Sequence, residues 1–186
     1  LWVQYDALPP PGVDPFPHTP FARSQMDAGN DFEIAIFSAL EAIGDVVHLD
    51  DSLPEPSREA ATLEAMASHK KICRYIDLPV QHIDDTILTA MKRGISADRT
   101  KNIISLVRGI MPDAALRTSL IVGFPGETKK RFARLLDFVR ETRFDHLGVF
   151  TYSREEGTAA AAMPSRIAQR EKERRREIIM SEQATI

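Results

Sequence analysis

Two pairs of residues suggest places where this sequence could bind a ligand. Gln81 offers an amide that both donates and accepts hydrogen bonds, and His82 offers an imidazole that can bind metal or move a proton. In the segment GFPGE, Gly123 and Gly126 permit close approach of the backbone to a ligand, and free amides at a helix start attract anions. Each pair also has a plainer interpretation, a structural histidine and a tight turn.

A third group consists of Thr151, Tyr152 and Ser153, whose hydroxyl groups follow an apolar stretch. Arg117 is a separate case, because it places a charge inside an otherwise apolar segment. A buried arginine requires an anionic partner, either an acidic side chain or the carboxylate of a ligand.

Alternating strand and helix patterns position these groups. Predicted strands start near residues 46, 75, 116 and 146, and helical patterns lie between them. The run at 120–122 is continuously apolar, which is typical of a strand buried on both faces of a sheet. Such alternation predicts an α/β fold with a parallel sheet, in which ligands bind beyond the carboxyl ends of the strands.

Three residues are predicted to begin helices because their side chains can cap free amides: Ser57, Asp84 and Ser96. A further helix is predicted from Thr128, after the GFPGE turn. In the terminal segment at 165–183, alternating acidic and basic residues predict a helix that faces solvent. A basic patch for RNA is the alternative there, but interleaved glutamates favour a solvated helix. We therefore predict a proline-rich irregular leader (1–31), a βα domain (32–160) and a charged terminal helix (161–186).

Length and composition exclude several classes of protein. The 186 residues are 43% hydrophobic and 27% charged, with a net charge of −3, which is typical of one globular domain that does not coat nucleic acid. A complete eight-unit barrel needs about 250 residues. There is no membrane-length apolar run and no targeting leader, so we expect a cytoplasmic protein. Because the chain begins at Leu1, we expect a fragment or a processed product.

The cysteine count limits metal chemistry. Cys73 is the only cysteine, so the sequence contains no intramolecular disulfide, no thiolate zinc site and no self-contained iron–sulfur site. We predict no metal ligand in this chain, and we expect Cys73 itself to be buried at a junction between helix and strand.

Three blocks of sequence together resemble one family. They read KICRYIDLPVQHIDDTILTAMKRG, LRTSLIVGFPGET and RFDHLGVFTYSREEGTAAA, and they resemble the radical S-adenosylmethionine (SAM) methylthiotransferases collinearly over residues 32–183. The QH at His82, the RT at Arg117 and the EEGT segment are similar to the subgroup that modifies a ribosomal protein. The sister branch, which modifies an adenosine of transfer RNA, typically has serine in place of His82 and no arginine at Arg117.

The resemblance implies part of a radical SAM (β/α) barrel, with about four parallel strands and flanking helices. It implies the cofactors SAM and [4Fe-4S] clusters, and methylthiolation of an aspartate in a small-subunit ribosomal protein (S twelve) rather than direct action on nucleic acid. No catalytic residue is assigned. Residues expected to bind the cofactor are Gln81, Arg117, Gly123, Gly126, Glu127, Val149 and Phe150. Residues expected on the substrate side are His82, Thr151 and Tyr152.

The sequence also departs from the family. The CxxxCxxC signature for the radical cluster is absent, so we expect this chain alone to be inactive. Basic residues at 129–131 stand where the family usually has acidic ones, with the wrong sign for the helix dipole. Alternatives are a non-catalytic truncated paralogue that binds the ribosomal protein or a nucleotide, a transfer-RNA adenosine methylthiotransferase, and an unrelated phosphate-binding βα domain that uses GFPGE. Half a barrel would also leave two open sheet edges, which predicts association.

Overall fold

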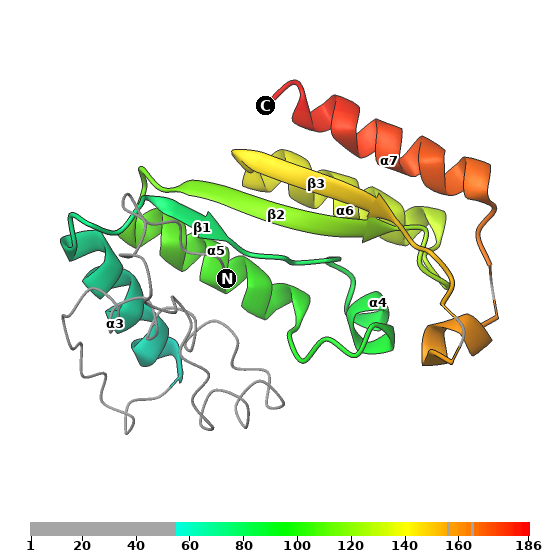
Figure 1. The fold of residues 1–186 in the computed structure, drawn as a ribbon, viewed down its shortest axis with the longest axis horizontal. Helices are drawn as coiled ribbons and strands as arrows, with labels where there is room; N and C mark the ends of the chain where they lie inside the picture. Colours follow the sequence, from blue (N-terminus) through cyan, green and yellow to red (C-terminus); the bar gives the residue numbers. More distant parts are fainter. Residues whose placement is uncertain (1–54, 156, 165) are drawn as a thin grey trace, which may run out of the picture. The chain divides into compact units, whose positions relative to one another are not determined.

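The computed structural model describes residues 55–155, 157–164 and 166–186 (Figure 1). The predicted leader and the strand near residue 46 lie outside the described residues. The described elements are, in chain order, α3 (Glu55–Ser68), β1 (Tyr75–Asp77), α4 (Asp85–Ala90), α5 (Ala97–Ile110), β2 (Ala115–Val122), α6 (Lys129–Thr142), β3 (His146–Thr151), the 3-10 helix η1 (Ala159–Ala162) and α7 (Gln169–Gln183). The predicted α/β alternation is confirmed, and the sheet order is β1-β2-β3.

The chain divides into two compact units. Of the described residues, 55–77 and 105–114 belong to the first unit, and 78–104 and those from 115 onward belong to the second. In the first unit, α3 has Leu63 and Met66 fully buried, as the sequence pattern predicts. Helix α3 begins at Glu55, two residues before the expected cap Ser57.

The second unit contains the predicted ligand-binding segments, and its centre is a parallel sheet. Strands β2 and β3 pair in parallel over the full length of β3, from Arg117 beside His146 to Val122 beside Thr151. On the other side of β2, residues 78–81 continue the ladder: the Leu78 and Gln81 amides donate to the Arg117 and Ser119 carbonyls at 2.8 and 2.9 Å. A strand over 75–80 was predicted, but only its first three residues form regular β1.

Strand β2 separates two different faces. Along β2 the burial alternates strictly: Leu116, Thr118, Leu120 and Val122 are fully buried, and the alternate residues are half-buried. The expectation of a strand buried on both faces is therefore wrong for this chain. Helix α6 lies behind β2 and β3 in Figure 1, and its buried residues are Phe132, Leu135, Phe138 and Val139.

Helix α7 packs against α6 and runs beside β3 (Figure 1). Its Arg176 Nε donates to the Val149 carbonyl at 3.3 Å, and its Lys172 Nζ donates to the Tyr152 carbonyl at 2.7 Å. Ile179 is fully buried and Arg175 is 4% exposed. The predicted helix is present, but it does not simply face solvent, and its side chains occupy the β3 edge that we expected to be open.

Three of the predicted helix starts are confirmed. Asp84 caps α4 by accepting from the Thr86 amide, Ser96 accepts from the Arg99 amide ahead of α5, and Thr128 caps α6. Each cap satisfies an amide that has no partner within its helix. Within the described part of the chain, no helix is both long enough and apolar enough to cross a membrane.

Candidate functional site

The half-buried face of the sheet is one candidate binding surface. On β2 this face carries Arg117, Ser119 and Ile121, and their neighbours on β3 are His146, Gly148 and Phe150. Phe150 is 59% exposed, which is high for a large aromatic side chain on a strand. A Cβ built on Gly148 would lie 3.6 Å from the Phe150 ring, so the ring lies back over this glycine. The result is an accessible aromatic surface on the sheet.

Gln81 lies close to the level of Phe150 along the sheet. It forms a parallel bridge with Leu120, which in turn is the neighbour of Val149 on β3. Its φ angle is 66°, and the His82 amide donates to the Val80 carbonyl at 2.8 Å, closing a three-residue turn centred on Gln81. Such turns are rare and strained, and strain of this kind is concentrated at functional sites.

Other predicted cofactor residues are separated from Gln81 and Phe150. Arg117 shares the half-buried face but lies four residues before Ile121, about 13 Å along the strand. Only an extended ligand could reach both positions. Val149 is buried on the opposite face, and Thr151 pairs with the buried Val122. Val149 and Phe150, which were expected to pack together against adenine, therefore cannot line one side of the same ligand.

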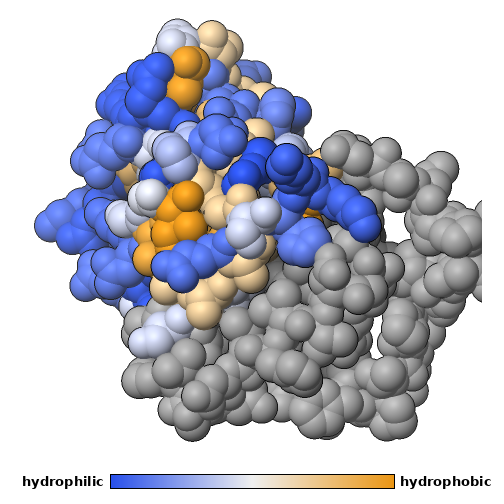
Figure 2. Space-filling view, turned by 90° about the vertical axis from the view of Figure 1, so that its left-hand side faces the viewer, coloured by the Kyte–Doolittle hydropathy of each residue, from blue (hydrophilic) through white to orange (hydrophobic). Residues whose placement is uncertain are grey.

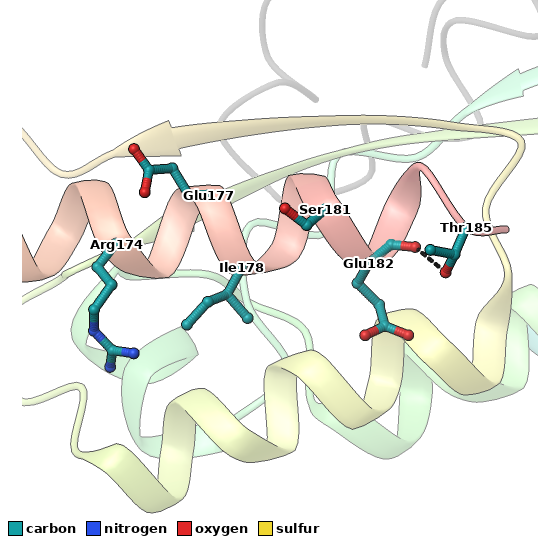
Figure 3. Close-up of a pocket in the computed structure, with 6 residues that line it drawn as sticks. All are labelled: Arg174, Glu177, Ile178, Ser181, Glu182 and Thr185. Carbon is teal, nitrogen blue, oxygen red and sulfur yellow. Dashed lines mark hydrogen bonds between the residues drawn. The ribbon is translucent and has the colours of Figure 1, made fainter.

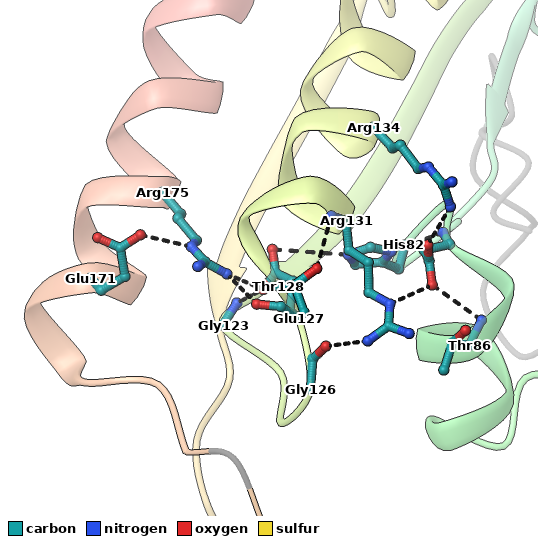
Figure 4. Close-up of polar contacts among 11 residues, drawn as sticks. His82, Thr86, Gly123, Gly126, Glu127, Thr128, Arg131, Arg134, Glu171 and Arg175 are labelled. Carbon is teal, nitrogen blue, oxygen red and sulfur yellow. Dashed lines mark hydrogen bonds and ion pairs between the residues drawn. The ribbon is translucent and has the colours of Figure 1, made fainter.

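The GFPGE segment forms a tight turn whose anion-binding capacity is already used. Gly123 and Gly126 have φ angles of 77° and 87°, which favour glycine. The Gly123 amide donates to the Glu127 carboxylate, and that side chain is fully buried (Figure 4). Glu127 therefore points into the protein, and its carboxylate takes the position next to this amide that a bound anion would need.

His82 is also directed inward rather than toward a substrate. Its side chain is fully buried, and its Nδ1 accepts a hydrogen bond from the Asp84 amide at 3.0 Å. This bond requires an unprotonated Nδ1, so the neutral ring carries its proton on Nε2. Nε2 lies 3.9 Å from Glu127 Oε1, and neither atom has a hydrogen-bond partner (Figure 4). The side chain of His82 is thus enclosed within the second unit rather than exposed on its surface.

Arg175 of α7 completes this buried group. Its Nη1 donates to the Glu127 carbonyl at 2.8 Å and lies 3.4 Å from Glu127 Oε2. Its Nε donates to Glu171 at 3.0 Å, and the guanidinium lies over the Phe132 ring, 5.2 Å from its centre. Hydrogen bonds from Arg174 and Arg175 lower the pKa of Glu171 to about 2.

A second ion cluster surrounds Asp84. Arg131 Nε and Arg134 Nη1 lie 3.1 and 2.9 Å from its carboxylate, and Arg131 also donates to the Gly126 carbonyl (Figure 4). Burial raises the pKa of Asp84, but the Arg134 hydrogen bond and the Arg131 charge outweigh burial, so the pKa lies below 3.8. Arg131, which has the wrong sign for the dipole of α6, is thus balanced by Asp84.

Two of the hollows in the second unit lie beside the GFPGE turn and along α7. The smaller, of about 100 Å³, brings the GFPGE turn and Tyr152 together beyond the strand ends, and basic side chains form part of its wall. Its lining includes Gly123, Pro125, Tyr152, Arg154, Arg166 and Lys172. The larger, of about 500 Å³, runs along α7 and the residues after it (Figure 3). No residue from a strand end lines this larger hollow, so it does not coincide with the predicted binding region.

Metal-binding side chains do not cluster in the part of the chain that the structure describes. Over residues 55–155, 157–164 and 166–186, no group of three or more His, Cys, Asp or Glu side chains could hold a metal ion. Cys73 is half-buried rather than buried, between α3 and β1.

Sequence reasoning missed Arg175 and the other arginines that bind Asp84 and Glu127. The signal available for Arg175 was its spacing. It lies four residues after Glu171 and four before Ile179, which places all three on one helix face. Because REKERRREII is charged at nearly every position, the sequence does not show which of its arginines lies on the buried face.

Comparison with known proteins supports the sequence resemblance. Residues 26–139 match the family model of the Radical SAM superfamily. Among curated proteins, the chain is 56% identical over 124 residues to the ribosomal protein uS12 methylthiotransferase RimO of Syntrophus aciditrophicus, covering 67% of this chain and 27% of that protein. The RimO proteins of Chloroherpeton thalassium and Heliobacterium modesticaldum are 47% and 50% identical over similar segments. The chain thus spans little more than a quarter of these relatives.

The fold has a solved counterpart. Coproporphyrinogen III oxidase (HemN) from Escherichia coli, a radical SAM enzyme, superposes with a TM-score of 0.52 at 18% identity, covering 73% of this chain and 29% of that one. At this level of identity the comparison establishes the fold alone. The family match covers more than half of the chain, and the parallel βα arrangement agrees with it. The chain belongs to the radical SAM superfamily.

Proposed function

We propose that this chain is part of a radical SAM methylthiotransferase that modifies an aspartate of a small-subunit ribosomal protein, and that it contributes a SAM-binding sheet face. The observation that carries the proposal is the 56% identity over 124 residues to a protein named for methylthiolation of uS12. His82 and Arg117, which resemble the ribosomal-protein branch rather than the transfer-RNA branch, favour a protein substrate. Such a substrate would place the protein in the cytoplasm.

The sheet face fits the chemistry of SAM. An adenine can stack on an accessible aromatic ring, and Phe150 supplies one beside the strained Gln81. The amino-carboxylate of an extended ligand could reach the Arg117 guanidinium further along β2. Gln81, Phe150 and Arg117 are thus the residues that we assign to SAM. Gly123 and Gly126 would shape the end of this surface through the backbone.

The iron–sulfur cluster does not fit the residues of this chain. A [4Fe-4S] cluster of the radical type needs three thiolates, and the sequence has the single half-buried Cys73. Ligands for a cluster would have to come from outside these 186 residues. We therefore assign SAM contacts to this chain and no redox step.

A segment exchange tests the proposal. The 124 matched residues of this chain would replace their counterparts in the Syntrophus aciditrophicus relative, which would retain its own remaining sequence. The expected result is a cluster-containing chimera that methylthiolates uS12, detected by mass spectrometry of the target peptide. The matched control carries Arg117→Ala in the exchanged segment and should bind SAM more weakly. A folded, cluster-containing chimera without SAM binding would contradict the proposal.

The single cysteine favours one alternative, a non-catalytic binding module. Anaerobic reconstitution of the chain with iron and sulfide separates this alternative from an active enzyme. We expect no stoichiometric cluster and no SAM cleavage by the chain alone. A cluster that cleaves SAM would exclude the non-catalytic module and would overturn the assignment of ligands above.

A further inference from the structure

We propose that Arg175 is a positioning residue of the ligand site, which acts through Glu127 to hold the GFPGE turn in place. The ligand side of this inference rests on the proposed function, but the structural link does not. If Arg175 holds the turn, helix α7 helps to shape the binding region.

Glu127 is the centre of the link. Its buried carboxylate faces three groups from three parts of the second unit (Figure 4): the Gly123 amide in the turn, the Arg175 guanidinium on α7, and Nε2 of His82 after β1. A buried carboxylate is stable only when it is paired and hydrogen-bonded. Among the described residues, Arg175 is the arginine that pairs with this carboxylate, so the position of Glu127 depends on it.

Gly123 transmits this dependence to the binding region. Its amide donates to Glu127, its φ is 77°, and it lines the hollow beyond the strand ends together with Tyr152. Gly123 also directly follows Val122, the last residue of β2. A shift of the Glu127 carboxylate would therefore move the turn that ends the sheet face assigned to SAM.

The geometry selects arginine over lysine. The guanidinium contacts both the carbonyl and the carboxylate of Glu127, bonds to Glu171 through Nε, and lies over Phe132. A lysine ammonium has the charge but lacks the planar fork that makes these contacts together. Arg174, the residue before Arg175, pairs with the same Glu171 but is largely exposed, so it provides a matched control.

The experiment compares Arg175→Gln and Arg175→Lys with Arg174→Gln in the full chain. The first measurement is the proton NMR shift of the Gly123 amide, which a bond to a buried carboxylate moves downfield. The second is the SAM dissociation constant. For Arg175→Gln we expect the downfield shift to be lost and SAM affinity to fall about tenfold, as for a charge-assisted hydrogen bond. Arg175→Lys should be intermediate, and Arg174→Gln should match the wild type within about twofold.

A double-mutant cycle tests whether Arg175 acts through Glu127. If it does, Arg175→Gln added to Glu127→Gln should cause no further loss of SAM affinity. Additive losses would overturn the inference, and so would an unchanged Gly123 amide in the folded Arg175 variants. If the wild-type chain fails to bind SAM, the proposed function fails, while the Gly123 signal still decides the structural link.

Discussion

Gln81 and His82 are neighbours in the sequence and lie in different environments. The left-handed conformation of Gln81 closes a tight turn, after which His82 is fully buried beside Glu127. A sequence-based reading could predict that both residues follow a strand. It could not predict that the His82 side chain is buried. That burial follows from the positive φ of Gln81, and glutamine has no marked preference for a positive φ. The residue roles were therefore less predictable than their positions along the chain.

The glycine turn gives a prediction about stability. We expect Gly123→Ala to lower the free energy of unfolding by several kcal/mol, because a Cβ there would overlap Lys172 Cγ at a φ of 77°. Gly126→Ala has open space around its Cβ and a φ of 87°, so it should lose only about 1–2 kcal/mol through backbone strain. Urea unfolding monitored by circular dichroism measures both changes.

Gly109 provides the control for these substitutions. It lies within α5 and has nothing within 4 Å of a built Cβ, so Gly109→Ala should stabilise the chain by about 0.5–1 kcal/mol. Equal losses at Gly123 and Gly126 would show that Lys172 does not pack against the turn as described.

Asp84 gives a prediction about pH. Its folded-state pKa lies below the ordinary value of 3.8, so its ion pairs stabilise the protein above that value and are lost as the pH falls through the lowered pKa. Asp84→Asn should therefore lower the free energy of unfolding by about 1 kcal/mol at neutral pH, since Arg131 and Arg134 are partly exposed. Urea unfolding from about pH 6 to about pH 3 should show this difference shrinking.

The exposed Asp98 in the first turn of α5 serves as the control for charge alone. Asp98→Asn should change stability by no more than about 0.5 kcal/mol at any pH in the series. A difference between wild type and Asp84→Asn that stays constant down to the lowest pH would be incompatible with the ion pairs.

Among the elements, helices were more predictable than strands. The starts of α4, α5 and α6 follow from local capping chemistry at Asp84, Ser96 and Thr128, which the sequence displays directly. The length of β1 depends on pairing with residues far along the chain, so a local apolar run overestimates it. The packing of α7 depends on a buried arginine, which charge patterns do not distinguish from an exposed one.

Helix α7 itself gives a prediction. Ile179 is fully buried, so Ile179→Ala should lower the free energy of unfolding by about 2–5 kcal/mol through lost burial and a cavity. The neighbouring Met180 is 39% exposed, and Met180→Ala should cost less than about 1 kcal/mol. Chemical denaturation of both variants measures the contrast. Similar small losses in both would mean that α7 is not docked on the sheet.

For the whole chain, the described sheet is part of a radical SAM barrel, with one face half-buried. Side chains of α7 occupy the edge of β3, so this edge is less available for association than an open sheet edge would be. Hydrophilic side chains dominate the face shown in Figure 2, and hydrophobic ones form small groups among them. Among the described residues, Phe150 and Met180 are the exposed large hydrophobic side chains.

Association of the chain should therefore depend on the sheet face rather than on the β3 edge. We expect the purified chain to self-associate and Phe150→Ser to reduce this association, because Phe150 is the most exposed large apolar group described. Met180→Ser is the control and should have a smaller effect. Light scattering as a function of concentration measures both. A wild-type chain that stays monodisperse at all concentrations would contradict the expectation.

The central claim is that the half-buried sheet face binds SAM, and amide NMR of the full chain tests it most directly. Titration with SAM should shift the amides of Gln81, Ser119 and Phe150, which lie near one level of the sheet, and leave those of the exposed α6 residue Arg140 unchanged. Inorganic phosphate is the comparison ligand. If SAM shifts none of these amides, while phosphate shifts those of Gly126 and Glu127, the claim is wrong and the GFPGE turn is a phosphate site instead.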